Sequence, residues 1–95
     1  MGTNEKPLKA VIESMLEAYQ LKAKINEVRI INEWANAVGP MISQKTEKLY
    51  VRRGKLYVYL SSSVIKNELV FARTEIIKRL NDAVGEQVIE ELVVK

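Results

Sequence analysis

The stretch that most constrains the fold is residues 46–63, which read TEKLYVRRGKLYVYLSSS. Apolar residues alternate with polar or aromatic ones over two short segments, a pattern that is typical of half-buried strands. Arg53-Gly54 separates the two segments. Because glycine accepts the positive φ that a tight hairpin turn requires, the sequence predicts a β-hairpin that turns at these two residues.

The turn also predicts which residues lie opposite each other in the hairpin. The pairs that a two-residue turn aligns are Val51 with Leu56, Leu49 with Val58, Tyr50 with Tyr57, and Lys48 with Tyr59. The first two pairs fall on one face of the sheet and the last two on the other, in agreement with the alternation. One face of the hairpin is therefore expected to be aliphatic and buried, and the other basic and aromatic.

The basic and aromatic face is the candidate nucleic-acid-binding site. Proteins that bind single strands combine aromatic rings, on which bases stack, with cations that neutralise phosphates. The residues of the predicted site are Lys48, Tyr50, Arg52, Arg53, Lys55, Tyr57 and Tyr59. A helix or a protein partner packed on this face is the alternative, because aromatic cross-strand pairs also stabilise a sheet by themselves.

The charge distribution is more informative than the net charge of +3. Residues 45–79 contain nine basic and three acidic residues, a local net charge of +6, whereas residues 80–95 carry a net charge of −3. The middle of the chain, which includes the hairpin, is therefore the part suited to an anionic partner.

The chain contains no histidine and no cysteine. The usual zinc ligands, general base and thiol nucleophile are therefore missing, and we predict neither an enzyme nor a metal or cofactor site. No apolar run approaches membrane-spanning length, and the first residues lack the pattern of a signal peptide. The expected protein is cytoplasmic and makes no membrane contact.

Helical periodicity predicts two helices before the hairpin. An apolar stripe predicts a first helix over residues 6–20, followed by a short connection and a second helix with Asn26 as its N-cap. Gly39-Pro40 is expected to end the second helix, and Trp34 to lie in the core. The first stripe is ordinary core, unless the domain is too small to cover it; it would then be a dimer or partner surface.

After the hairpin, the sequence predicts a long helix and a last strand. One of the serines 61–63 caps a helix over residues 63–83, Gly85 ends it, and residues 87–94 are rich in β-branched residues. A crossover helix allows the last strand to pair parallel to a hairpin strand. The predicted fold over residues 1–95 is a single α+β two-layer domain, in the order α-α-β-β-α-β.

An ordered set of core and turn residues completes the sequence pattern. The set consists of Trp34, Val38-Gly39, Thr46, Gly54-Lys55-Leu56-Tyr57-Val58, Ser61-Ser62, Glu68-Leu69, Leu80-Asn81 and Val84-Gly85. With its spacing, this set resembles the DciA-like family of bacteria, from about residue 28 to the C-terminus.

The resemblance implies a K-homology-like small sheet with helices on one face. It also implies DNA binding and an interaction with the replicative helicase, so the expected protein is a non-enzymatic module that contacts both. The alternative is a protein–protein interaction domain, homodimeric through its first helix, that binds no nucleic acid. The RNA clamp of K-homology domains needs two glycines three residues apart, and the glycines here are residues 2, 39, 54 and 85. The likeness to K-homology domains therefore does not extend to this clamp.

Overall fold

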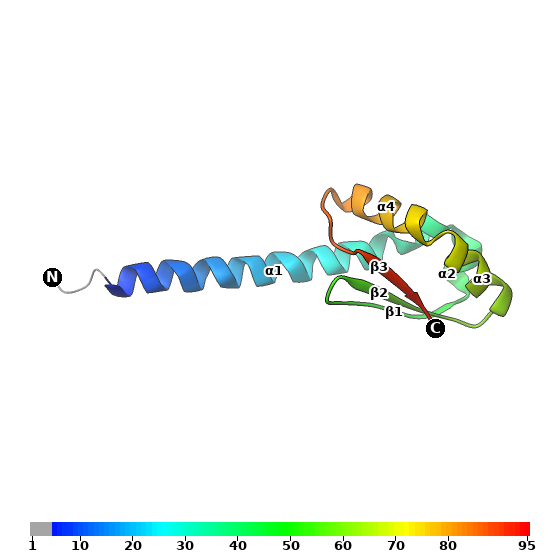
Figure 1. Ribbon diagram of the computed structural model, residues 1–95, viewed down its shortest axis with the longest axis horizontal. Helices are drawn as coiled ribbons and strands as arrows, with labels where there is room; N and C mark the ends of the chain where they lie inside the picture. Colours follow the sequence, from blue (N-terminus) through cyan, green and yellow to red (C-terminus); the bar gives the residue numbers. More distant parts are fainter. Residues whose placement is uncertain (1–4) are drawn as a thin grey trace.

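The computed structural model of the chain describes residues 5–95. Its helices are α1 (Glu5–Val38), α2 (Pro40–Gln44), α3 (Ser63–Phe71) and α4 (Arg73–Val84). Its strands are β1 (Thr46–Arg52), β2 (Lys55–Leu60) and β3 (Glu91–Val94). The sheet and the three shorter helices form a body at one end of the molecule, and α1 projects far beyond it (Figure 1). The molecule measures 67 × 21 × 18 Å.

The three strands form one mixed sheet in the order β1-β2-β3. β1 and β2 are antiparallel, and all four predicted cross-strand pairs are present, including Leu49 opposite Val58 and Tyr50 opposite Tyr57. At the turn, Arg53 has φ 51° and Gly54 has φ 76°. Two successive positive φ angles are those of a type I′ turn, whose twist suits a two-residue hairpin. β3 pairs parallel to β2, as the crossover helix predicted.

The aliphatic face of the hairpin is the floor of the core. Leu56 and Val58 have no exposed surface and Leu60 is buried, whereas Leu49 and Val51 on the edge strand are half-buried. The helix residues packed in the same cluster are Ile30 and Trp34 from α1, Ile65 and Leu69 from α3, and Ile76 and Leu80 from α4. Helices on one face of a small sheet confirm the α+β fold.

The indole of Trp34 lies in this core, as predicted, with 3% of its surface exposed. Its Nε1 donates a hydrogen bond to Thr46 Oγ1 at 3.0 Å, and that hydroxyl donates to the carbonyl of Ile42 at 2.9 Å. The polar end of a buried indole normally finds such a partner. The contact ties α1 to α2 and to the first residue of β1.

The predicted connection at residues 21–26 is wrong, because α1 is one continuous helix from Glu5 to Val38. The segment Leu21–Ile25 contains neither glycine nor proline, and leucine, lysine and alanine are good helix formers. Asn26 is therefore not an N-cap. It is buried where α1 meets the body, and its Nδ2 donates to Glu86 Oε2 at 2.6 Å.

The single helix predicted over residues 63–83 is also wrong, because it is divided into α3 and α4 at Ala72. Ala72 has φ −97° and ψ 7°, and its N–H points at the carbonyls of both Glu68 and Leu69. The division lets α3 pack on β2 and β3 while α4 packs on α1 and β3. At the start of α3, Ser62 Oγ accepts from Ile65 N, so a serine cap is confirmed.

The last strand is shorter than predicted, because the backbone of residues 88 and 89 is held by a side chain instead of a ladder. Asn81 is buried, and its Oδ1 accepts from the N–H groups of Val88 and Ile89 at 2.9 and 3.0 Å. Its Nδ2 donates to the Ile89 carbonyl at 2.8 Å. With Gly85 in the left-handed conformation that ends α4, this contact aims the chain into β3.

Candidate nucleic-acid interface

The outer face of the hairpin carries a stack of tyrosines. The rings of Tyr50 and Tyr57 are 4.8 Å apart between centroids and 11° from parallel, and those of Tyr50 and Tyr59 are 6.3 Å apart at 26°. Lys48 Nζ lies 5.2 Å from the Tyr50 centroid and 5.5 Å from that of Tyr59, within cation–π range. Tyr50 is therefore engaged with two rings and an ammonium group.

The other three predicted residues, together with Tyr57, line a hollow beside the turn. Arg52, Arg53, Lys55 and Tyr57 line a depression of about 200 Å³. Tyr57 belongs both to this hollow and to the tyrosine stack, so it connects the two groups. The structure thus places the predicted residues along the outer face and turn of the hairpin, in two sets. A packed set of Lys48, Tyr50 and Tyr59 lies toward the open end, and an open set around Tyr57 lies beside the turn.

Arg53 occupies an unfavourable backbone conformation at the tip of the hairpin. Its φ of 51° lies in the left-handed region, where a side chain with a Cβ costs on the order of 1–2 kcal/mol. Asparagine or glycine would fit this turn position without that cost. The Gly54 carbonyl accepts from Glu90 N at 2.8 Å, which anchors the turn to the segment that leads into β3. The backbone that carries the Arg53 guanidinium group is therefore held in place at the tip of the hairpin.

Two acidic side chains lie near the cations of the hollow: Glu91 in contact with Lys55, and Glu90 beside Gly54. Lys55 Nζ lies 3.2 Å from Glu91 Oε2, and both side chains are about half-exposed. The hydrogen bond with Glu91 is the main cause that raises the pKa of Lys55. Lys55 is thus charged but partly neutralised. Sequence reasoning missed Glu91, because its place beside Lys55 depends on the register of the parallel pair β2–β3.

Tyr50, at the centre of the tyrosine stack, adds no negative charge to this face. The Tyr59 hydroxyl, as a hydrogen-bond partner, raises the pKa of Tyr50 above its ordinary value of 10.0, and desolvation adds to the shift. Tyr50 is therefore neutral at physiological pH, and Glu91 is the acidic residue in direct contact with the predicted site.

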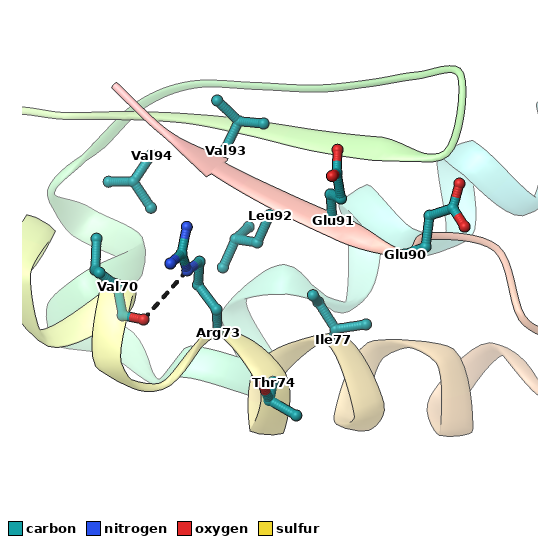
Figure 2. Close-up of a pocket in the computed structure, with 9 residues that line it drawn as sticks. All are labelled: Val70, Arg73, Thr74, Ile77, Glu90, Glu91, Leu92, Val93 and Val94. Carbon is teal, nitrogen blue, oxygen red and sulfur yellow. Dashed lines mark hydrogen bonds between the residues drawn. The ribbon is translucent and has the colours of Figure 1, made fainter.

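A larger groove runs between β3 and the α3–α4 pair (Figure 2). Its volume is about 480 Å³, and its walls include Val70, Ile77 and Leu92. Arg73 reaches into it from α4, and its Nε donates to the Val70 carbonyl at 3.2 Å. Glu90 and Glu91 border the same groove, so its walls present both signs of charge. The groove lacks the uniform positive lining of a phosphate site.

The described part of the chain offers no metal centre, because no three His, Cys, Asp or Glu side chains gather there as ligands. Among residues 5–95, no helix is long and apolar enough to cross a membrane.

A protein-family model described as "Dna[CI] antecedent, DciA" matches residues 7–94 of this chain. The chain belongs to the DciA family. The DciA family is a helicase-loader-like family, associated with the replicative helicase and not with an enzymatic activity. The matched region begins before residue 28, where the sequence resemblance started, and it includes the projecting half of α1. No curated protein matches the chain.

Proposed function

We propose that this member of the DciA family is a non-enzymatic module that binds single-stranded nucleic acid on the hairpin and acts with the replicative helicase. The observation that carries the nucleic-acid part is the hollow that Arg52, Arg53 and Lys55 line together with one aromatic residue, Tyr57. The helicase part rests on the family alone.

The two sets of hairpin residues support different roles in binding. A base stacks on Tyr57 while Arg52 and Arg53 contact the flanking phosphates. This arrangement is typical of single-strand binders, in which aromatic rings stack on bases and basic side chains follow the phosphate backbone of the nucleic acid. Lys48, Tyr50 and Tyr59 hold the Tyr57 ring in place through the stack and the cation–π contacts. A single strand is preferred over a duplex, because a duplex hides the faces of its bases.

The strained turn also supports a binding role. Residues held in sparsely populated backbone regions cluster at functional sites, where the strain is offset elsewhere in the structure. Here an arginine occupies a position in which asparagine or glycine would be more stable. A requirement for a positive charge at the tip of the hairpin would explain why this position is arginine.

A salt titration tests the proposal. A labelled single-stranded oligonucleotide and its duplex are titrated with the full chain at several salt concentrations, and binding is followed by fluorescence anisotropy. Each phosphate contact to a single strand contributes about 0.7 to the slope of log affinity against log salt, so three to five contacts give roughly −2 to −3.5. Failure to bind either DNA at low salt would overturn the nucleic-acid part of the proposal.

Two substitutions separate charge from stacking. Arg52→Ala should flatten the salt slope by about 0.7, because one phosphate contact is lost. Tyr57→Ala should weaken binding by about 1–3 kcal/mol with little change in slope, because it removes stacking alone. Lys78→Ala is the matched control, since Lys78 is exposed on α4 and outside the predicted site. Equal effects of Arg52→Ala and Lys78→Ala would mean that only overall charge matters.

A third substitution uses the acidic neighbour of the hollow. Glu91→Gln frees Lys55 from its ion pair and removes a charge that repels phosphate. Binding should tighten by up to about fivefold, the scale of an exposed ion pair. Unchanged affinity would exclude Lys55 from the interface.

The helicase part needs a separate measurement. Purified replicative helicase is mixed with the chain in the absence of nucleic acid, and complex formation is followed by light scattering on a sizing column. A complex that survives Tyr57→Ala would show that the two activities use different surfaces. No complex would leave nucleic-acid binding as the function to be tested.

A further inference from the structure

The N-terminal half of α1 carries an uncovered apolar stripe on a helix that projects from the body (Figure 1). Its six large side chains are each between 51% and 67% exposed: Leu8, Val11, Ile12, Met15, Leu16 and Tyr19. From residue 7 onward, the first buried residue of α1 is Asn26. The first ion pair between α1 and the body among these residues is Lys22 Nζ to Glu86 Oε1, at 2.8 Å. We call residues 5–21, which precede this ion pair, the overhang.

A contiguous apolar surface of this size on a protein is normally covered by another molecule, which is here called its cover. Side chains scattered singly on a surface are ordinary, but a contiguous patch marks a place where another molecule sits. The overhang is also a helix of about 25 Å that has no tertiary packing among the described residues, and isolated helices of this length are marginal in water.

We propose that the cover is the overhang of a second copy of this chain, packed antiparallel about a two-fold axis between residues 13 and 14. The apolar stripe runs from Leu8 to Tyr19, so its midpoint lies between these residues. The midpoint of the overhang falls at residue 13. An antiparallel partner therefore covers the whole stripe, and the start of its α1 reaches Lys22, where the body begins.

The direction of the partner follows from the face on which the stripe lies. From Tyr19, steps of seven, four and four residues lead to Asn26, Ile30 and Trp34, and such steps stay on one side of a helix. The stripe therefore points to the side on which the body sits. In a parallel pair, both bodies would lie at the same end and face each other across the helix contact. Packed helices are only roughly 8–10 Å apart, whereas the molecule is 21 × 18 Å across, so the two bodies would collide. Antiparallel copies carry their bodies at opposite ends.

The antiparallel register places each apolar side chain of the stripe opposite another apolar side chain. The pairs that face each other are Leu8 with Tyr19, Val11 with Leu16, and Ile12 with Met15, each residue with its partner on the other copy. The six side chains present on the order of 600 Å² of apolar surface per copy, near the roughly 800 Å² per partner of a standard specific interface. The area is sufficient for a reversible dimer.

The charges on the projecting half favour a protein partner over a membrane surface. Between residues 7 and 25 the charged side chains are Lys9, Lys22 and Lys24 against Glu13 and Glu17. A helix that lies on anionic lipid carries a strong basic excess on its polar face. This near balance is that of a helix in water with one covered side.

The mass of the full chain in solution tests the dimer. Sedimentation equilibrium over a concentration series should show a rise from 10.9 kDa toward twice that mass. Ile12→Glu should keep the chain at 10.9 kDa throughout, because it buries a charge at the centre of the interface. Ser14→Glu is the control, since Ser14 lies on the same turn but outside the stripe, and it should dimerise like the unmodified chain. Buried emission from Trp34 reports that each variant is folded.

Cysteine pairing tests the direction. The chain has no cysteine, so Leu8→Cys and Tyr19→Cys each introduce a single thiol. In the antiparallel dimer, oxidation of a mixture should join one variant to the other, and neither to itself, because residues 8 and 19 are about 16 Å apart along the helix.

Two results would overturn the proposal. A mass of 10.9 kDa up to about 1 mM would rule out the second copy and leave the stripe to a different partner. Leu8→Cys joined to itself would mean a parallel pair. The proposal does not depend on nucleic-acid binding, because the overhang and the hairpin share no residue.

Discussion

The two halves of α1 have the same apolar periodicity but differ in burial. Ile30 and Trp34 are buried against the sheet and the other helices, whereas the stripe from Leu8 to Tyr19 remains more than half exposed on the same side of the same helix. Periodicity is a local property, and it predicts a helix and its apolar face. Burial depends on what the rest of the chain brings to that face, and the body ends near Lys22.

The largest expected difference between the two halves is in core truncation. Leu56→Ala should lower the free energy of unfolding by about 2–5 kcal/mol, because it leaves a cavity beneath the helices. Leu16→Ala should change it by less than about 0.5 kcal/mol when the chain is monomeric, since Leu16 contacts little. Urea unfolding at low protein concentration measures both values. Equal costs would mean that the overhang packs against the body in solution.

The same distinction explains which parts of the fold could be predicted. The register of the hairpin was predictable from Lys48 to Tyr59, because it follows from a turn and an alternation, whereas the irregularity between Thr46 and Lys48 was not predicted. The continuity of α1 was not predicted: the two apolar stripes were interpreted as two helices, although residues 21–25 contain no helix breaker. The division at Ala72 was also missed, since it serves packing on two different elements and not a local signal.

The candidate site divides in a similar way. Its seven residues follow from the alternation and the turn, and the structure places them along the outer face and tip of the hairpin. The separation into a packed set and an open set needed the ring distances. Glu91 lies more than thirty residues from Lys55 in the sequence, and only the parallel pairing of β2 and β3 brings the two together.

The second expected effect concerns a buried polar residue in the body. Asn81→Leu should cost about 1–3 kcal/mol, because the N–H groups of Val88 and Ile89 lose their acceptor away from water. Asn36→Leu is the matched control, since Asn36 is exposed on the body half of α1. Thermal unfolding followed by circular dichroism compares the two. A cost for Asn36→Leu as large as for Asn81→Leu would point to a general loss of polarity.

The smallest expected effect lies at the junction of the two regions. The ion pair with Lys22 is the main cause that holds the pKa of Glu86 below its ordinary value of 4.5, and the hydrogen bond from Asn26 adds to it. A carboxyl whose pKa is lower in the folded state contributes stability above its unfolded pKa. That contribution is lost as the pH falls through the lowered value. Glu86→Gln should therefore lower the melting temperature at pH 6 and have less effect at pH 3.

Lys22→Gln identifies the partner responsible for this pH dependence. With the ammonium group removed, the pKa of Glu86 should move toward 4.5, and the effect of Glu86→Gln should differ less between pH 6 and pH 3, because Asn26 and Arg29 still lower that pKa. Melting temperatures of the two single variants and the double variant at both pH values complete the cycle. If the effect of Glu86→Gln keeps its full pH dependence in the Lys22→Gln background, Lys22 does not hold the base of the overhang to the body, and the boundary between the two halves of α1 lies nearer Asn26.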